Sequence, residues 1–273
     1  MKKKLLGILI AMAIGIPTYA SVSVAPTRLE INANKIRNNY ATTAIEIRGD
    51  KSKATRYRVY SGYFKISDQS TVEIVDKNSD IYDLSDKIRY VPSEFTIPPG
   101  KTQKLRVNIA NIKNLPDGES RAILYIEDIE AKEYNVPNNL GIGAQLILKT
   151  RVGVPIYVDK GKFVKKADIE YFKVVKNKKG DYTEIKINST GNSRVRYNGI
   201  VQIVKGKKLI DEYSIEGRAV GENNHYIAKD AIKTKNLKEA GEYTLKLILY
   251  YQDENGVRKN IKKDAIYNVD GNI

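Results

Sequence analysis

The stretch GIGAQLILKTRVGVPIYV, residues 141–158, alternates apolar with small or polar residues, and this period of two is typical of a β-strand. Successive strand residues point to opposite faces of a sheet. Two cations, Lys149 and Arg151, stand on either side of a single threonine close to the apolar residues. This combination predicts a strand that contacts more than its own domain, although a row packed inside its own domain remains the alternative. The apolar row consists of Ile142, Ala144, Leu146 and Leu148.

The rest of the chain is dominated by short strand patterns, such as SVSVAPTRLEI (21–31) and TRYRVYSGYFKI (55–66). Val, Ile, Thr and Tyr alternate with charged residues, and Gly, Pro, Asn or Asp mark the joins. Only the short segment 78–88 has a pattern that also fits a helix. The sequence therefore predicts an all-β protein built from sandwiches or barrels of antiparallel sheets.

The strand signal pauses at the polar, glycine-containing stretch VDKGKFVKK (158–166) and then resumes. We expect a first domain over 21–158, a linker over 159–165 and a second β domain over 166–273. In the second domain, AGEYTLKLILYY (240–251) has the pattern of a late strand of an immunoglobulin-type sandwich. Tyr243 is expected to be its structural corner tyrosine.

The first twenty residues have the pattern of a secretory signal peptide. Three lysines precede an apolar run that is too short to span a membrane, and small residues follow it before Ser21. We therefore expect residues 1–20 to be removed on export, with no stable membrane insertion. Cysteine is absent, so the exported chain has no disulfides.

The chain is basic, with 47 Lys and Arg against 32 Asp and Glu and a formal charge of +15. These cations are spread along the sequence, which is typical of a solvated basic surface. The functional alternative is attraction to acidic partners or to a membrane surface. Nucleic acid is not an expected partner of an exported chain that lacks a nucleic-acid-binding motif.

No catalytic motif is apparent. The single histidine, His225, lies in a polar stretch without cysteines and is poor material for a metal site or a nucleophile–base pair. Serine-hydrolase, phosphate-binding, zinc-protease and dinucleotide fingerprints are also absent. We expect a protein without catalytic residues, metal or cofactor, although a pair of carboxylates of the glycosidase type cannot be recognised from spacing.

Several segments in the right order together resemble the periplasmic chaperones of the chaperone–usher pilus pathway. The resemblance rests on a Thr-Arg-aliphatic first strand, a Pro-Gly turn that ends in Gln-x-x-Arg, a Gly-Glu-x-Arg strand and two later strands. It implies two immunoglobulin-like domains in an L-shaped arrangement, with a cleft that binds pilus subunits. The segments are SVSVAPTRLEI (21–31), VPSEFTIPPGKTQKLRV (91–107), LPDGESRAILYIE (115–127), GAQLILKTRVGVPIYV (143–158) and NSTGNSRVRYNGIVQI (188–203).

The same resemblance implies a function. Such a chaperone works in the periplasm without ATP, lends a strand to an incomplete pilus or fimbrial subunit, and delivers that subunit to an outer-membrane usher. The 142–148 row would then enter the groove of the subunit. A charge-assisted clamp on the subunit's C-terminal carboxylate would fix the register.

The resemblance assigns this clamp to an arginine on the first strand and a lysine on the donor strand. Arg28 matches the arginine, but the lysine position falls on Gly153. Arg151 is the first substitute and Lys149 the second. Val158-Asp159 replaces an Arg-Pro pair of many relatives, so their interdomain salt bridges are not expected here.

Two other readings stay open. One alternative is a secreted two-domain β-sandwich that is itself a structural or adhesive component of a surface fibre. The other is an extracytoplasmic hydrolase, for which the sequence offers no set of catalytic residues. For the chaperone, the sequence leaves open whether the free protein caps itself as a homodimer.

Overall fold

The computed structural model describes residues 22–67, 69–130, 132–136, 144–234, 236–237 and 239–270, with 132–136 and 144–148 described by their backbone. The predicted signal peptide (1–20) and Ile142 lie outside the described residues. The long elements are all strands, which confirms the all-β prediction, and no helix in the described ranges is long and apolar enough to cross a membrane. The short 3-10 helices are η1 (Ala33–Lys35), η2 (Ser85–Lys87), which falls within 78–88, and η3 (Ile112–Asn114).

The first domain is a sandwich of two sheets. One sheet has the order β1-β3-β8-β6, and the other has the order β2-β12-β9-β4-β5, with β7 also paired to β4. This order, in which the first strand is divided between the two sheets, is that of an immunoglobulin-like sandwich. The strands are β1 (Ser23–Ala25), β2 (Leu29–Asn32), β3 (Tyr40–Arg48), β4 (Thr55–Ile66), β5 (Val72–Val75), β6 (Ile88–Val91), β7 (Glu94–Ile97), β8 (Thr102–Ala110), β9 (Gly118–Asp128) and β12 (Arg151–Lys160).

The alternation of apolar residues in β12 buries one face of this strand in the core, as expected. Val154, Ile156 and Val158 are fully buried in the core between the sheets, together with Leu124 and Ile126 of the neighbouring β9. β12 also pairs in parallel with β2, where Leu29 lies opposite Ile156. This register places Arg28, which directly precedes β2, beside Pro155.

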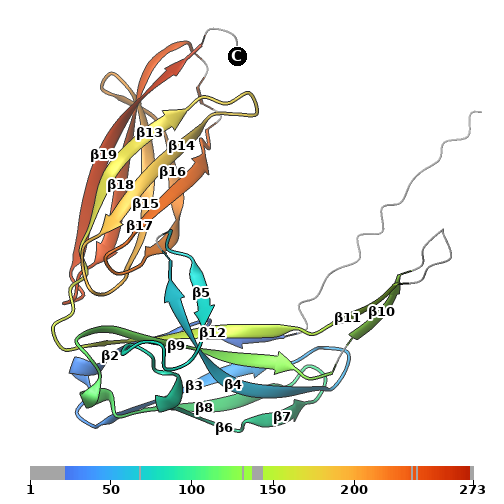
Figure 1. Cartoon of the computed structure of the whole chain (residues 1–273). Coiled ribbons are helices and arrows are strands. Elements are labelled where there is room, and N and C mark those ends of the chain that lie inside the picture. Colours follow the sequence, from blue (N-terminus) through green and yellow to red (C-terminus); the bar gives the residue numbers. More distant parts are fainter. Residues whose placement is uncertain are drawn as a thin grey trace, which may run out of the picture.

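The predicted strand 141–158 is divided in the structure. Its first part is β11 (Ala144–Leu148), which pairs antiparallel with β10 (Lys132–Val136) and with no other described strand. Lys149 and Thr150 separate β11 from β12. The β10–β11 pair continues β9 and β12 beyond the sandwich, and Figure 1 shows it projecting from the end of the first domain away from the second domain.

The second domain is also an immunoglobulin-like sandwich. Its sheets have the orders β13-β14-β17 and β16-β15-β18-β19. The polar, glycine-containing stretches 176–181, 205–208 and 253–256 are tight turns that join consecutive antiparallel strands. The strands are β13 (Ala167–Val175), β14 (Tyr182–Ser189), β15 (Val195–Lys205), β16 (Lys208–Val220), β17 (His225–Ala231), β18 (Gly241–Gln252) and β19 (Arg258–Val269).

Tyr243 has the geometry of a tyrosine corner. Its side chain is 2% exposed, and its hydroxyl donates a 2.8 Å hydrogen bond to the carbonyl oxygen of Glu239. A hydroxyl bonded to the backbone a few residues upstream is the mark of this corner in immunoglobulin-like domains. The prediction of a structural role for Tyr243 is confirmed.

The two domains are joined by a short connection, since β12 ends at Lys160 and β13 begins at Ala167. Each domain has its own hydrophobic core. Figure 1 shows the second sandwich standing across one end of the first, so that the two together have the expected L shape. The inner corner of the L lies between β2, the loop before β15 and the near ends of β15, β18 and β19.

Candidate functional site

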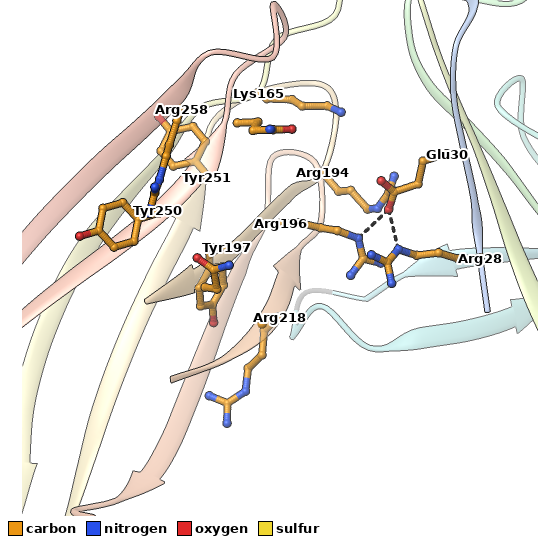
Figure 2. Close-up of a pocket in the computed structure, with 13 residues that line it drawn as sticks. Arg28, Glu30, Lys165, Arg194, Arg196, Tyr197, Arg218, Tyr250, Tyr251 and Arg258 are labelled. Atoms are coloured by element: carbon orange, nitrogen blue, oxygen red, sulfur yellow. Dashed lines mark hydrogen bonds and ion pairs between the residues drawn. The ribbon is translucent and has the colours of Figure 1, made fainter. Parts of the chain in front are cut away.

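A cavity of about 650 Å³ lies in this inner corner (Figure 2). The first domain contributes Arg28 and Glu30, and all the other lining residues belong to the connection or to the second domain. The cavity is therefore a feature of the domain arrangement, which neither sandwich has alone. The lining residues are Arg28, Glu30, Lys165, Arg194, Arg196, Tyr197, Asn198, Gly217, Arg218, Tyr250, Tyr251, Gln252 and Arg258.

The cavity is strongly cationic. One lysine and five arginines line it, and Glu30 is the acidic residue among the lining side chains. Arginine is well suited to bind carboxylate ligands because its planar guanidinium group holds them in a fixed geometry. The site therefore favours an anionic ligand over a neutral or cationic one.

Glu30 organises three of these cations. One of its carboxylate oxygens, Oε1, accepts hydrogen bonds from Arg28 Nε at 2.8 Å, Arg194 Nη2 at 2.7 Å and Arg196 Nε at 2.7 Å. Burial raises the pKa of Glu30, but the charge of Arg194 and the hydrogen bonds from all three arginines outweigh burial and lower that pKa to about 2. Glu30 therefore stays ionised and holds the three guanidinium groups together.

Arg28 and Arg196 use only their Nε atoms in these contacts with Glu30. Their terminal Nη atoms form no hydrogen bond with another side chain of the described residues and stay available at the cavity wall, where Figure 2 shows the two guanidinium groups side by side. A single carboxylate thus holds a pair of arginines from different domains. The pair has excess positive charge and is suited to bind a second carboxylate.

Behind the cavity, a buried ion network joins the domains. Arg194, which is 4% exposed, bonds to Glu119 of β9 and stacks on the ring of Tyr157, with 3.3 Å between its Cζ and the ring centroid. Arg121, also on β9, bonds to Glu222 of the second domain. Burial of such ions is costly unless they are paired, so these contacts require the two domains to stay in contact.

Asp159 adds to this network. It accepts a 2.6 Å hydrogen bond from Ser193 Oγ and forms a 2.7 Å ion pair with Lys165. The interdomain bridges of the resembled family were not expected because Val158-Asp159 replaces its Arg-Pro pair. A different network stands in their place, and Asp159 is part of it.

A second connection lies on the other side of the corner, between the β4–β5 loop and the second domain. Ser70 Oγ donates to the carbonyl oxygen of His225 at 2.9 Å and accepts from the amide of Gly221 at 3.1 Å. Asn224 donates from its side chain to the carbonyl oxygen of Ser67. Two separate sets of contacts, the buried ion network and the hydrogen bonds of the β4–β5 loop, therefore fix the angle between the two domains that enclose the cavity.

The residues predicted for the clamp do not all meet at this cavity. Arg28 lines it, whereas Arg151 stacks on Tyr125, 4.6 Å from the ring centroid, and bonds to the Tyr60 hydroxyl at 3.3 Å. Because Arg28 lies beside Pro155, Arg151 is about 13 Å away along β12 at the usual strand rise. Lys149 is exposed between β11 and β12.

Gly153, at the position of the family's lysine, has no room for a longer side chain without movement of its neighbour. A Cβ there would lie 2.6 Å from Cδ1 of Ile123. Ile123 and Tyr125 thus cover the face on which such a lysine would stand.

The donor row is placed only in part. Ala144, Leu146 and Leu148 belong to β11, where Leu146 lies opposite Tyr134 in the register with β10. Ile142 lies outside the described residues. Three of its four residues therefore lie on a strand that belongs to neither sandwich.

Glu30 and the arginines of the second domain are not among the site residues predicted from the sequence. Arg28 directly precedes β2 and Glu30 lies within it, and in the same way Arg194 directly precedes β15 and Arg196 lies within it. Residues two positions apart in an extended chain point to the same side, so this spacing could have indicated that each pair lines one site. Among the described residues, no group of His, Cys, Asp and Glu has an arrangement that would hold a metal ion.

Comparisons with known proteins gave no match to a family model and no match among curated proteins. Among solved structures, the chain is similar to the class 5 fimbriae chaperone CfaA, with 13% identity, a TM-score of 0.45, and coverage of 90% of this chain and 99% of the other. The Pseudomonas aeruginosa CupB2 chaperone shares 10% identity at a TM-score of 0.43, over 89% of this chain and 100% of its own.

A third similar structure is the CsuC–CsuE chaperone–tip subunit pre-assembly complex from archaic chaperone–usher Csu pili of Acinetobacter baumannii. It has 14% identity and a TM-score of 0.43, and the match covers 90% of this chain and 98% of that one. These three structural neighbours, each similar along about nine tenths of the present chain, are chaperones of fimbriae or pili or complexes that contain one.

Proposed function

We propose that this protein is a periplasmic chaperone that holds incomplete pilus or fimbrial subunits by donor-strand complementation and delivers them to an outer-membrane usher. The role is one of binding without catalysis or ATP. The observation that carries the proposal is β11, a strand outside both sandwiches that pairs only with β10 among the described strands. Its other edge pairs with no strand of the described residues, and an unpaired edge of this kind binds an extended segment of another chain.

The sequence of β11 and of the residues before it supports this role. Leu146 and Leu148 of β11, and Ile142 before it in the sequence, are large aliphatic residues at alternating positions. Burying each in the open core of a subunit is worth about 1.5–3 kcal/mol, or about 5–9 kcal/mol together before the cost of association. Backbone pairing would supply direction and register.

The cationic cavity supplies the second contact in this proposal. Arg28 binds the C-terminal carboxylate of the subunit, and Arg196 is the cation that acts with it, because the same Glu30 oxygen holds both. Arg151 and Lys149, our first candidates for that second cation, then contact the subunit farther from its terminus. Gly153 leaves β12 without a cation of its own at the cavity.

Co-expression tests the proposal. The chain is exported together with affinity-tagged candidate fibre subunits, meaning small exported proteins encoded beside it, and the amount of chain recovered with each subunit is measured. We expect Arg28→Ala and Leu146→Asp each to reduce recovery at least tenfold. Arg48→Ala is a matched control, since Arg48 is an exposed arginine on β3 of the other sheet.

Two results would contradict the proposal. Equal recovery of wild type and Leu146→Asp would remove the donor strand from the mechanism. If the purified chain alone instead formed a ladder of oligomers on size-exclusion chromatography, the fibre-component reading would be favoured.

A further inference from the structure

The edge of β12 that pairs with β2 is open along its first residues. β2 pairs with β12 from Ile156 to Asp159, and no described strand pairs with this edge over 151–154. A subunit segment that binds β11 can therefore continue along this part of β12 until it meets the chain that leads into β2. Because Arg28 lies beside Pro155, the last residue of such a segment lies opposite Val154 and places its carboxylate next to Arg28.

This placement fixes the register of the segment. It runs parallel to β12, as β2 does, and aligned residues of such a pair face the same side, since Leu29 and Ile156 lie opposite each other and both are buried in the core. Counting back from Val154, the residue three positions before the last lies opposite Arg151. Neighbouring strands are about 4.8 Å apart, so these two side chains can meet on the outer face of the sheet.

Arg151 is held on this outer face by two tyrosines. Its guanidinium lies 4.6 Å from the ring centroid of Tyr125 and donates a 3.3 Å hydrogen bond to the Tyr60 hydroxyl. The ring of Tyr125 is itself fixed, because the residue is 6% exposed and packs against Tyr60 with 5.1 Å between the ring centroids. Arg151 is therefore an exposed cation with a restricted position, which lowers the entropy cost of binding an anion.

The carboxylate opposite Arg151 is already bound by another arginine. Glu127 of β9 lies between Arg151 and Arg58 of β4 in the strand register, and it bonds to Arg58 at 2.7 Å. Arg151 forms no ion pair with a carboxylate of the described residues. Two arginines thus flank one glutamate, so this cross-strand row has a positive charge in excess and favours an additional carboxylate.

We propose that Arg151 binds an acidic side chain of the subunit, located three residues before the subunit's last residue. This inference rests on the proposed function and adds a feature of the subunits that the protein accepts, namely Asp or Glu at that position. Arg151 would then discriminate between subunits, whereas Arg28 and Arg196 bind the C-terminal carboxylate that every subunit has.

Fluorescence anisotropy with the purified chain and labelled peptides tests the inference. The probes are ten-residue peptides of Val, Ser and Thr with a free C-terminus, and they carry Glu, Gln or Lys three residues before the last. We expect wild type to bind the Glu peptide about two- to fivefold more tightly than the Gln peptide, as for an exposed ion pair. Arg151→Gln should bring these two peptides to equal affinity, and Arg151→Glu should bind the Lys peptide more tightly than the Gln peptide.

Separate controls address position, general charge and the carboxylate clamp. Glu placed two or four residues before the last points to the opposite face and should give a smaller preference. Arg48→Gln removes an exposed arginine of the other sheet and should retain the full Glu preference. A peptide with a C-terminal amide should bind less tightly than the free acid, which measures the clamp independently of Arg151.

The outcomes are distinct. Equal binding of the Glu and Gln peptides by wild type, or a Glu preference that survives Arg151→Gln, overturns the inference, while a preference for the free acid leaves the carboxylate clamp in place. A Glu preference of the same size at all three positions also overturns it, because attraction to a basic surface would then be sufficient. Equal binding of acid and amide, or no binding of any free-acid peptide, instead contradicts the clamp itself.

Discussion

Replacement of Arg194 by Met should weaken the contact between the domains more than any other single change at the cavity. Met retains much of the aliphatic packing over Tyr157 but removes the charge. Glu119, which is 1% exposed, then loses its main partner and keeps a long 3.5 Å hydrogen bond from Ser193 Oγ and the charge of Arg121, whose Nε lies 3.9 Å away. A buried carboxylate with so little compensation is strongly unfavourable.

The magnitude follows from this burial. Removing one partner of a buried ion pair typically costs about 3–5 kcal/mol. Arg121 remains close, and Glu119 can take up a proton, so we expect a loss at the lower end, about 3 kcal/mol. Arg196→Met is the matched control: it removes a neighbouring arginine that is 35% exposed, and its loss should stay below about 1 kcal/mol.

Urea unfolding followed by circular dichroism measures the loss. Burial raises the pKa of Glu119, and removal of Arg194 takes away the strongest opposing charge. The penalty of Arg194→Met should therefore shrink between pH 7.5 and pH 5, as Glu119 takes up a proton in the folded variant. Adding Glu119→Leu should recover at least half of the lost stability.

A loss of stability in Arg194→Met no larger than in Arg196→Met would contradict a specific role of the buried pair. So would a double variant in which Glu119→Leu added its own destabilisation to that of Arg194→Met. In either case the buried pair would contribute nothing specific to the interdomain contact.

Two further predictions concern single groups. The pKa of Glu30 is lowered from 4.5 to about 2 in the folded state, so its stabilising contribution is complete above pH 4.5 and is lost as the pH falls towards 2. Since its side chain is 43% exposed, we discount this contribution to about 1–2 kcal/mol, and urea unfolding at pH 5 and pH 2.5 should show that Glu30→Gln removes the difference. Tyr243→Phe should cost about 1 kcal/mol through the lost bond to the Glu239 carbonyl, measured by thermal unfolding of the second domain, and an unchanged melting temperature would contradict a structural corner.

Local pattern was sufficient for much of the fold. The alternation of Val154, Ile156 and Val158 required a strand with one buried face, and the glycine-rich turns required hairpins. Tyr243 could be assigned because the corner depends only on residues four positions apart. Each of these features is decided within a short segment.

The cavity could not be predicted in the same way, because it depends on how two domains meet. Arg196 lies beside Arg28 because it bonds across the interface to Glu30, which also bonds to Arg28 within the first domain. The parallel pairing of β2 with β12 likewise decides that Arg28 stands next to Pro155, away from Arg151. Neither contact can be predicted from the spacing of residues along the chain.

The corner of the L and the projecting strand pair are parts of one continuous segment, since β11 leads through Lys149 and Thr150 into β12. From Leu148 to Pro155, beside the cavity, the chain covers about 23 Å at strand rise. A subunit whose C-terminal residue binds in the cavity would reach β11 only if its open groove began at that distance from its C-terminus. If the protein binds subunits as proposed, this fixed distance would select them by the length of their C-terminal segment. One or two residues added at the C-terminus of a subunit would shift its groove out of register with β11.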